Sequence, residues 1–316
     1  MSLFVALQMD PIEQVSVTAD STFRIGLEAE RRGHRLFHYT VDQLRYDEGR
    51  VIARGRPVTL RQVAGDHVTF GDWADVELTD FDVVWLRQDP PFDMGYVTST
   101  HLLDRVRDRV MVVNDPFWVR NCPEKLMVLD FPDLTPPTMI ARDPAALRAF
   151  RARHGEIIVK PLYGNGGAGV FHIKPGDPNL SSLLETFAGI NREPMIAQKY
   201  LPAVVRGDKR IILVDGEPVG AINRVPQDGE ARSNMHVGGR AEKVGITGRE
   251  REICARLAPV LREKGLIFTG IDVIDGWLTE INVTSPTGIQ ELERFDGTNA
   301  AEAIWIAIER RIAAAR

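Results

Sequence analysis

The chain has 316 residues, of which 44% are hydrophobic and 26% are charged, and its formal net charge is −5. This length allows two or three domains with cores of their own, and the composition is that of an ordinary globular protein. An acidic chain is not expected to bind nucleic acid or anionic membranes through general electrostatic attraction.

The cysteines and the N-terminal residues indicate a cytoplasmic protein. Cys122 and Cys254 are far apart and form no zinc-binding spacing, which is typical of a reducing compartment. Residues 1–10 lack a basic segment before their short apolar run, so they predict a buried strand rather than a signal peptide. No apolar run approaches the roughly 20 residues that a membrane span needs. We therefore expect a cytoplasmic protein without a membrane partner.

The first third of the chain alternates strand-like and helical segments. A helical segment at residues 22–32 stops at Gly33, and apolar strand-like runs occupy residues 3–9, 34–39, 83–86 and 110–113. This alternation predicts an open, mostly parallel α/β sheet, in which ligands bind at the carboxyl ends of the strands. The polar residues at those ends are Asp10, Arg87, Asn114 and Asp115.

A Pro-rich segment at residues 131–137 opens a second unit. It is followed by a predicted helix at residues 144–154 and a strand at residues 157–160, while residues 299–316 have the spacing of a terminal helix. We expect three domains: an N-terminal α/β domain at residues 1–122, a small domain with a glycine-rich flap at residues 123–200, and a large domain with a metal site and a substrate loop at residues 201–316.

Residues 164–169 satisfy the spacing G-x-G-x-x-G, but their context differs from that of a dinucleotide-binding site. In such a site the glycines lead from a strand into a helix, whose N-terminus holds the pyrophosphate. Here residues 170–173 alternate like a strand, and Pro175 and Gly176 follow. The run therefore predicts a flap between two strands, whose backbone N–H groups can lie over phosphates, as in protein kinases. A hairpin without function is the alternative, which the entropy cost of four glycines disfavours.

Two lysines, Lys160 and Lys125, lie at the ends of predicted secondary-structure elements. Lys160 ends an apolar strand directly before the flap, and Lys125 stands at the start of an expected helix. Most lysines are solvated surface residues. Beside a glycine flap and a cation site, however, both become candidate phosphate ligands.

Two further segments carry groups suited to a nucleotide or an anion. Residues 196–202 end a strand and could line an adenine pocket, although an interdomain linker explains them equally well. Residues 224–240 form a long polar loop whose arginines can pair bidentately with carboxylates or phosphates. Solvated surface charge is the alternative for Arg232. The polar side chains of this loop include Arg224, Arg232, Asn234, His236 and Arg240.

The most informative segment spans residues 270–286. Two alternating apolar runs flank Asp275 and Gly276, which is a strong hairpin signal. Glu280 and Asn282 lie two residues apart on the second strand and so share a face. Carboxylate and amide oxygens without Cys or His favour a hard cation such as Mg²⁺. Taken alone, the segment fits an ordinary half-exposed hairpin with a solvated polar face better than a metal site.

Whether Asp272 shares the face of Glu280 depends on the turn. A two-residue loop would pair Asp272 with Thr279 and place it on the face opposite Glu280. A three-residue loop at residues 274–276, with Gly276 left-handed, shifts the parity and brings Asp272 and Glu280 together. We expect the three-residue form, since it makes Asp272 a ligand.

Taken in their order along the chain, the candidate residues resemble the site pattern of ATP-grasp ligases. The chain resembles the bacterial glutathione synthetases along its whole length. The run Thr-Glu-Ile-Asn-Val-Thr-Ser-Pro-Thr is highly specific. The chain departs from the family at Tyr163, where Asp is expected, and at Gly288, where Cys is expected. The resembling segments are residues 9–12, 89–93, 122–126, 208–210, 214–218, 238–240 and 279–287.

The resemblance implies an ATP-grasp fold preceded by an open, mostly parallel α/β domain. It implies an enzyme that joins γ-L-glutamyl-L-cysteine to glycine and releases glutathione, ADP and phosphate. The carboxylate would first accept the γ-phosphoryl group, and the glycine amine would then attack the acyl phosphate. The expected partners are these small molecules and further copies of the chain, in a dimer or a tetramer.

The resemblance also implies roles for individual residues. Arg210 would stabilise the charge that develops at the reacting carboxylate. Mg²⁺, or Mn²⁺ in its place, would bind Asp272, Glu280 and Asn282. ATP, as co-substrate, would contact Lys125, Lys160, Gly164, Gly166, Gly167, Gln198, Tyr200, Leu201 and Asp208. The other substrates would contact Arg224, Arg232, Asn234, Arg240, Ser285, Pro286 and Thr287.

Three alternative functions remain open at this point. An ATP-grasp ligase for another acid and amine would keep the ATP and metal residues and change the 224–240 loop and the turn at residues 285–288. An NAD-dependent oxidoreductase would need a helix after Gly169. A nucleotide-binding module without catalysis would not depend on Glu280 for activity.

Overall fold

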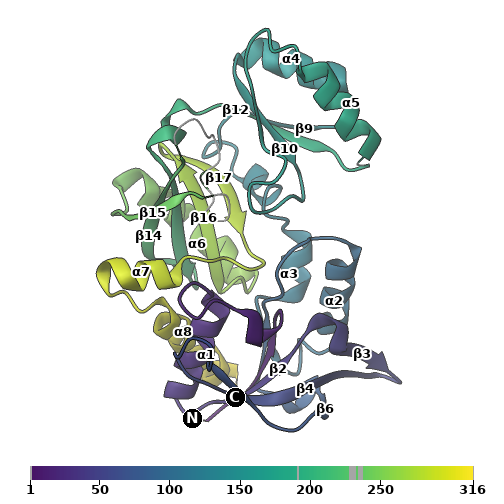
Figure 1. Ribbon diagram of the computed structural model, residues 1–316, viewed down its shortest axis with the longest axis vertical. Coiled ribbons are helices and arrows are strands. Elements are labelled where there is room, and N and C mark those ends of the chain that lie inside the picture. Colours follow the sequence, from purple (N-terminus) through teal and green to yellow (C-terminus); the bar gives the residue numbers. More distant parts are fainter. Residues whose placement is uncertain (1, 191, 228–232, 234–237, 316) are drawn as a thin grey trace.

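The computed structural model describes the chain except residues 1, 191, 228–232, 234–237 and 316. The strands form three sheets that follow one another along the sequence (Figure 1). In this view the first sheet lies at the bottom, the second at the top and the third between them on the left. Strands and helices alternate through all three parts, so the protein has the predicted α/β class.

The first sheet has a parallel centre and an antiparallel edge. The strand order is β3-β4-β2-β1-β7-β8, and β5 and β6 also pair with β4. Strands β2, β1, β7 and β8 are parallel, as the sequence predicts, whereas all the pairings of β4 are antiparallel. The strands are β1 (Phe4–Gln8), β2 (Arg35–Tyr39), β3 (Leu44–Asp47), β4 (Arg50–Leu60), β5 (Val68–Phe70), β6 (Ala74–Glu77), β7 (Val83–Leu86) and β8 (Met111–Val113).

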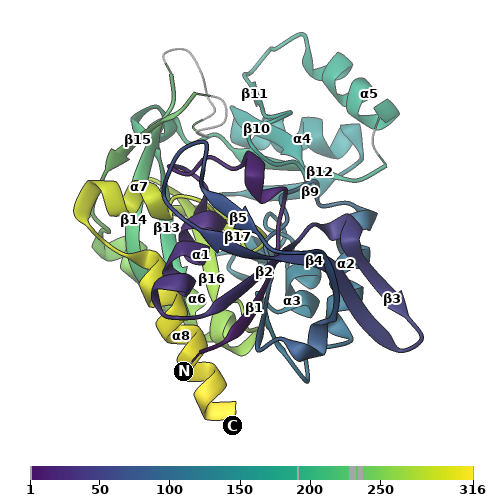
Figure 2. The same ribbon diagram turned by 60° about the horizontal axis from the view of Figure 1, so that its bottom comes forward.

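Helices cover both faces of this sheet because successive residues of a strand point to opposite sides. Val5 and Leu7 pack with α1 (Ser21–Arg31) and the C-terminal helix, while Ala6 faces the core that includes α2 (Met94–Asp104) and α3 (Pro116–Asn121). Asp20 caps α1, since its carboxylate accepts the Phe23 N–H at 2.6 Å. Figure 2 shows α1 beside the C-terminal helix α8 (Ala300–Ala315).

The second sheet is small and antiparallel, with the order β11-β10-β12-β9. Two helices pack on it around a core of its own, which contains Leu147, Phe150 and Ile157. The first helix spans the predicted residues because Asp143 caps it and Pro144 takes its first position. The elements are β9 (Thr138–Ala141), α4 (Pro144–His154), β10 (Ile157–Pro161), β11 (Phe171–Ile173), α5 (Leu180–Ile190) and β12 (Met195–Lys199).

The glycine run lies between β10 and β11, which are antiparallel neighbours. The prediction of a flap between two strands is therefore confirmed. A strand rather than a helix follows Gly169, and this excludes the dinucleotide-binding fold that the glycine spacing alone would suggest.

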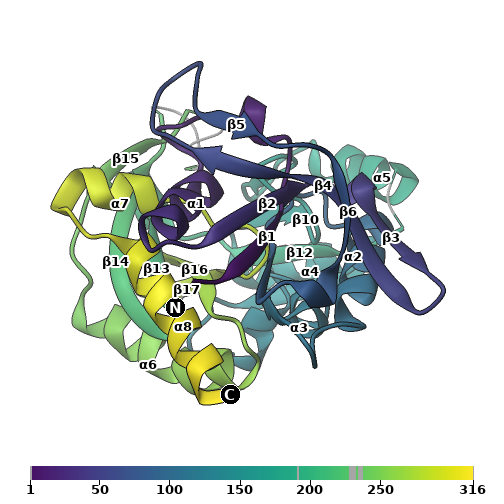
Figure 3. The same cartoon turned by 90° about the horizontal axis from the view of Figure 1, so that it is seen from below.

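The third sheet is antiparallel, with the order β15-β14-β13-β16-β17. Ile212 and Ile222 share a core with Trp305 of α8, and this core extends to α1 and the first sheet (Figure 3). The elements are β13 (Asp208–Val214), β14 (Glu217–Val225), β15 (Arg240–Lys243), α6 (Gly248–Glu263), β16 (Phe268–Ile274), β17 (Trp277–Asn282), α7 (Ile289–Asp296) and α8 (Ala300–Ala315).

Short 3₁₀ helices complete the described secondary structure. One of them corrects a prediction, because Lys125 lies in a turn before such a helix and not at the start of an α-helix. In the part of the chain that the structure describes, no helix is long and apolar enough to cross a membrane. The 3₁₀ helices occupy Ile12–Gln14, Val41–Gln43, Leu78–Asp80, Met127–Asp130 and Pro202–Arg206.

Candidate active site

The hairpin of β16 and β17 has a two-residue turn, so the predicted three-residue turn is wrong. Ile274 pairs with Trp277 across the turn, and both Asp275 and Gly276 are left-handed, with φ of 51° and 78°. This is the turn geometry that suits the right-handed twist of two antiparallel strands, and it is common for an Asp-Gly pair. The left-handed conformation predicted for Gly276 is correct.

A bulge at Thr279 nevertheless brings the polar residues together. Val273 pairs with Leu278, but Asp272 pairs with Glu280, so Thr279 is an extra residue on β17. Its hydroxyl donates to the Asp272 carbonyl oxygen at 3.1 Å. One inserted residue shifts the parity of the strand, just as a three-residue turn would have done. Asp272 and Glu280 therefore face the same cleft.

Two arginines hold the Asp272 carboxylate. Arg210 binds it through Nε at 2.5 Å and Nη2 at 3.1 Å, and Arg224 Nη2 lies 3.0 Å from Oδ2. Burial alone would raise the pKa of Asp272, but the two guanidinium groups lower this pKa well below its usual value. The Asp272 side chain is thus an anion that fixes the position of Arg210.

Two lysines approach the neighbouring carboxylate. Lys160 Nζ lies 2.7 Å from Glu280 Oε1, and Lys125 Nζ lies 3.8 Å from the same oxygen. Lys125 also donates to the carbonyl oxygen of Gly164 in the flap. Burial opposes ionisation of Glu280, yet Lys160 and Lys125 lower its pKa. The two lysines, the flap and the hairpin are therefore joined by direct contacts.

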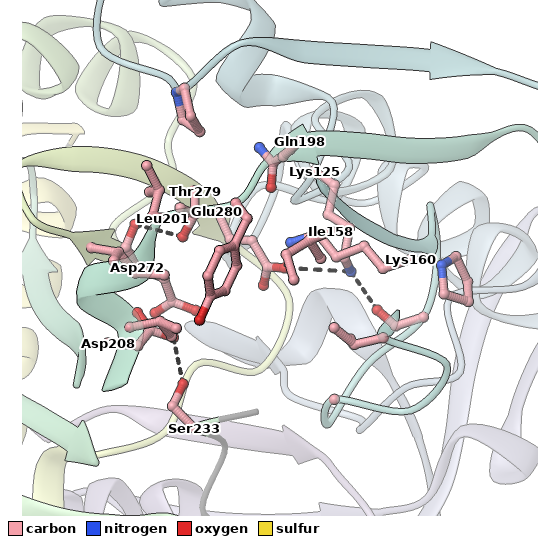
Figure 4. A pocket seen from close by; sticks show the side chains of 18 of the residues that line it. Lys125, Ile158, Lys160, Gln198, Leu201, Asp208, Ser233, Asp272, Thr279 and Glu280 are labelled. Carbon is pink, nitrogen blue, oxygen red and sulfur yellow. Dashed lines mark hydrogen bonds and ion pairs between the residues drawn. The ribbon is translucent and has the colours of Figure 1, made fainter. Parts of the chain in front are cut away.

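These groups line a cleft between the second and third sheets. Figure 4 shows Lys125 and Lys160 on one side of it and Asp272 and Glu280 on the other. Its mixture of apolar walls and charged groups is that of a site for a small ligand. Of the predicted nucleotide residues, the lining includes Lys125, Lys160, Gly164, Gly166, Gly167, Gln198, Tyr200, Leu201 and Asp208.

The end of β12 forms the apolar side of this cleft. Gln198 donates to Thr138 at 3.2 Å, and the ring of Tyr200 stacks on His172 with a centroid distance of 3.9 Å. Leu201 and Ile158 contribute aliphatic surface. This wall suits the flat, weakly polar adenine ring better than the charged side of the cleft does.

Asp208 lies deep in the cleft beside Arg224 and Ser233. Arg224 Nη2 is 2.6 Å from Asp208 Oδ2, and the Ser233 hydroxyl donates to the same oxygen at 2.9 Å. Burial raises the pKa of Asp208 to about 6, although Arg224 opposes the shift. Asp208 Oδ1 accepts no hydrogen bond from the described residues, so it can accept one from a ligand.

Of the predicted substrate residues at positions 224–240, the structure describes Arg224 and Arg240, whose side chains have different partners. Arg224 belongs to strand β14 rather than to a loop, is buried, and is bound to Asp208 and Asp272. Arg240 begins β15, and its exposed side chain pairs with Glu242 at 2.5 Å. Arg232, Asn234 and His236 lie outside the described residues.

The segment after β17 connects the cleft to the first sheet. Ser285 donates to Asp89 at 2.8 Å, and the carbonyl oxygen of Pro286 accepts from Arg87 at 3.1 Å. The carbonyl oxygen of Thr287 accepts from Arg210 Nη1 at 3.4 Å. The strand-end residues Asp10 and Arg87 share a second cavity. Asn114, in contrast, is a structural residue that binds the backbone of Phe268 and Val283.

Some residues of the site were missed from the sequence. Thr279 gave no signal, because a bulge leaves the alternation of a short strand ambiguous. Ser233 stands between two predicted residues, and only its contact with Asp208 identifies it. Glu124 directly precedes Lys125, and its carboxylate accepts the Thr284 hydroxyl at 2.6 Å. No sequence signal reveals this contact, because Glu124 and Thr284 lie 160 residues apart.

The donor set of the hairpin fits a divalent metal of the hard class. Asp272 and Glu280 offer carboxylate oxygens, and Asn282 uses its amide nitrogen for Gly270 O and Asp272 Oδ2, which leaves its carbonyl oxygen for a ligand. Within residues 2–190, 192–227, 233 and 238–315, no group of three His, Cys, Asp or Glu side chains forms a metal site. A metal would thus rest on two carboxylates and one amide, together with ligand oxygens.

The cleft between two antiparallel sheets holds two lysines and a glycine flap opposite paired carboxylates, and the match to an ATP-grasp domain makes the protein an ATP-dependent ligase of the ATP-grasp class. Sequence comparison defines it more narrowly. The models described as "Prokaryotic glutathione synthetase, N-terminal domain" and "Prokaryotic glutathione synthetase, ATP-grasp domain" match residues 3–120 and 124–297. The chain belongs to the prokaryotic glutathione synthetase family.

Curated relatives agree with this assignment. The glutathione synthetase of Brucella melitensis is 60% identical over 311 residues, which cover 98% of this chain and 100% of the relative. That of Salmonella typhimurium is 42% identical, with 98% and 99% covered. The resemblance that the sequence predicted is therefore confirmed, and so is the use of ATP together with a divalent metal typical of the family.

Solved structures show the same fold at low sequence identity. The D-cycloserine synthetase DcsG aligns with a TM-score of 0.70 at 19% identity and covers 98% of this chain and 99% of its own. The macrocyclase MdnC of Microcystis aeruginosa aligns with a TM-score of 0.62 at 18% identity, with 98% and 100% covered. The predicted ATP-grasp fold is thus confirmed.

Proposed function

We propose that this chain joins γ-L-glutamyl-L-cysteine to glycine at the expense of ATP, with release of glutathione, ADP and phosphate. The observation that carries the proposal is the convergence of Lys125 and Lys160 on Glu280, opposite the Asp272–Arg210 pair. This arrangement places cations for phosphate groups beside an arginine that can neutralise a reacting carboxylate. Family membership supports the identity of the two substrates.

The nucleotide binds in the cleft between the second and third sheets. Its phosphates contact Lys125, Lys160 and the backbone N–H groups of the flap at Gly164, Gly166 and Gly167. Gln198, Tyr200, Leu201 and Asp208 hold the adenosine, with the ribose near the unpaired Asp208 oxygen. Closure of the flap over this site excludes water, which would otherwise hydrolyse an acyl phosphate.

Arg210 is the catalytic residue of the proposal. Its guanidinium is locked by two bonds to Asp272, so it holds a fixed position near the site of charge transfer without reorganising. Mg²⁺, or Mn²⁺ in its place, would bind Asp272, Glu280 and Asn282. Bound there, the ion would neutralise phosphate charge and align the γ-phosphoryl group with the carboxylate.

The two other substrates lie on the side of the cleft that faces the first sheet. The residues after β17 support this position, since Ser285 and Pro286 contact Asp89 and Arg87, which follow strand β7 of that sheet. Arg224 contributes to substrate binding by holding the Asp208 and Asp272 carboxylates in place. The proposed substrate residues are Arg224, Arg232, Asn234, Arg240, Ser285, Pro286 and Thr287.

A coupled assay of ADP release tests the function. Wild-type protein should release ADP with γ-glutamylcysteine, glycine, ATP and Mg²⁺, and should release little when glycine or the dipeptide is omitted. Glutathione formation measured by mass spectrometry should match the ADP released. Absence of turnover with this pair, together with turnover of another acid and amine, would establish a different ATP-grasp ligase.

The organisation of the molecule adds further proposals. We assign domains to residues 1–122, 123–200 and 201–316, supported by the three separate sheets. We place the protein in the cytoplasm, since both cysteines are free and buried. We also propose a homo-oligomer, a dimer or a tetramer, which light scattering coupled to size-exclusion chromatography would test.

A further inference from the structure

Glu124 is a carboxylic acid at the meeting point of the three sheets to which the proposed reaction has so far given no role. It lies in the turn before the Met127–Asp130 helix, and its carbonyl oxygen accepts the Ile281 N–H at 3.1 Å. Its side-chain Oε1 accepts the Thr284 hydroxyl at 2.6 Å. Oε2 accepts no hydrogen bond from any side chain or backbone group that the structure describes. One carboxylate oxygen is therefore fixed and the other is open to a ligand.

The cavity beside Glu124 adjoins the nucleotide cleft. Lys125, Gly164 and Asn165 line both spaces, so the flap base forms a common wall. On the other side, the cavity is bounded by Pro90 and Thr284, which directly follow and precede the bonded pair Asp89 and Ser285. A molecule in this cavity would lie between the phosphate site and the first sheet. That is where an amine must approach a carboxyl group that has just received a phosphoryl group.

The charged groups around Glu124 make it a suitable base. Lys125 and Arg210 are the cations facing it, Glu280 is the nearby anion, and the buried Tyr96 hydroxyl faces it from α2. Burial raises the pKa of Glu124, the Thr284 hydrogen bond, Lys125 and Arg210 oppose the rise, and Glu280 adds to it. A carboxylate with a raised pKa holds a proton more strongly than an exposed one, which favours proton abstraction near neutral pH.

We propose that the Glu124 carboxylate accepts the proton that the glycine ammonium must lose before its nitrogen attacks the acyl phosphate. The inference rests on the proposed function, since it assumes that acyl phosphate and that acceptor. A free ammonium has no lone pair and cannot attack. Of the other carboxylates in the cleft, Asp272 binds two arginines and Glu280 binds Lys160. Asp208 binds Arg224 and Ser233 through one oxygen, and its other oxygen is assigned above to the ribose of the nucleotide.

The step balances without any further reactant. One N–H proton passes from the ammonium to Glu124, and the freed lone pair forms the C–N bond at the acyl carbon. The C–O bond to phosphate then breaks, and the phosphate leaves with the electron pair. The second proton that the new amide nitrogen loses goes to the departing phosphate. Glu124 returns its proton to water after the products leave.

The alternative role of Glu124 is a purely structural brace for Thr284, and Glu124→Gln separates the two. Glutamine keeps an oxygen for the Thr284 hydroxyl but cannot take a proton at neutral pH. Hydroxylamine is an acceptor already unprotonated at neutral pH, so it needs no base. For the variant at pH 7 we expect kcat with glycine to fall by about 10²-fold, while kcat with hydroxylamine stays within about twofold of wild type. The loss with glycine should shrink as the pH is raised toward 9.

Glu30→Gln is the matched control. Glu30 is also a partly buried glutamate whose pKa is raised by burial, but it binds the Leu60 N–H in the first sheet, far from the cleft. It should leave both acceptors unaffected. If Glu124→Gln does not fold, Glu124→Asp takes its place. This variant retains a carboxylate, so it should keep part of the activity with glycine and leave turnover with hydroxylamine unaffected.

Two results would overturn the inference. Equal losses with glycine and hydroxylamine would make Glu124 a structural brace, and unchanged turnover with glycine would remove it from the reaction. Positional isotope exchange in ATP, measured with γ-glutamylcysteine and no amine, should be the same in wild type and Glu124→Gln. Failure of the proposed function is a separate outcome, because wild-type protein would then show no turnover with either acceptor.

Discussion

Lys160 Nζ lies 2.7 Å from Glu280 Oε1 and joins the small second sheet to the proposed metal hairpin over 120 residues of sequence. Both side chains are largely buried, with 10% and 19% exposed. A buried ion pair is a poor source of stability, because desolvation offsets most of its Coulomb energy. Its value here is positional, since the pair holds a cation at the place where the phosphates of a nucleotide would lie.

Replacing Lys160 with Met removes this cation from the phosphate site, while Lys125 stays as a cationic neighbour of Glu280. We expect kcat/KM for ATP to fall by about 10²-fold or more, because one preorganised charge at the transferred phosphoryl group is lost. Steady-state ADP release at varied ATP measures this effect. Lys174→Met, an exposed lysine just beyond β11, is the control and should leave the kinetics unchanged. A Lys160→Met enzyme with wild-type kcat/KM would rule out the phosphate role.

Loss of the Glu280 carboxylate should abolish metal-dependent activity. The bulge at Thr279 brings Glu280 opposite Asp272, and both carboxylates are proposed ligands of the metal. We expect Glu280→Ala to lose Mn²⁺ binding, measured by electron paramagnetic resonance. Thr279→Ala keeps the bulge and loses only the hydrogen bond from the hydroxyl to Asp272, so it should cost about 1 kcal/mol of stability and retain metal binding. Metal binding by Glu280→Ala would contradict the proposed ligand set.

This hairpin shows how far the sequence could be followed. Alternation and the Asp-Gly pair identified the strands, the turn residues and the polar face. They could not place the parity shift, because a bulge inside a strand and a longer turn give the same pattern of faces. The Thr279–Asp272 hydrogen bond decides between them, and it forms only in three dimensions.

Arg224 illustrates the other limit. Its position before a long polar segment favoured a loop residue that clamps a substrate. The structure places it inside β14, where it binds one carboxylate from β13 and one from β16. Those partners lie 16 and 48 residues away in sequence, so no local pattern reveals the pairing. The glycine flap, in contrast, was predictable, since the strand on each side of it is a local feature.

The raised pKa of Asp208 makes a prediction about stability and pH. Burial raises this pKa from 3.8 to about 6, so the folded state holds a proton that the unfolded state releases between those pH values. The contribution to stability is present below pH 3.8 and is lost as the pH rises through 6. Asp208→Asn removes this loss and should stabilise the protein at pH 8, by up to about 3 kcal/mol for two pKa units.

Urea unfolding at pH 4.5 and pH 8 measures the effect. The difference between the variant and wild type should be small at pH 4.5, where Asp208 is mostly neutral in the folded state, and larger at pH 8. The affinity for ATP should fall in the same variant, because stabilising a functional site by removing its buried charge also removes a group that binds the ligand. A stability difference that does not change with pH would show that the pKa of Asp208 is not raised in the folded state, because Arg224 offsets the effect of burial.

Tyr163, one of the two departures from the family, forms a contact between the flap and the first sheet. Its ring stacks on Phe92 with a centroid distance of 5.8 Å and an interplanar angle of 23°. Gly164, the next residue, accepts the Lys125 hydrogen bond. Tyr163 thus anchors the flap base at a position where Asp could not make an aromatic contact.

A double-mutant cycle with Tyr163→Ala and Phe92→Ala tests this anchor. Stacked pairs contribute about 0.5–1.5 kcal/mol beyond area burial, so the stability losses of the two variants should be non-additive by about that amount in thermal unfolding. Both single variants should also raise KM for ATP, because the flap base loses its fixed position. Tyr46→Ala, an exposed tyrosine on β3, is the control and should change neither quantity. Additive stability losses with an unchanged KM for ATP would mean that the rings touch without holding the flap. If the contact anchors the flap, losing either ring must weaken nucleotide binding.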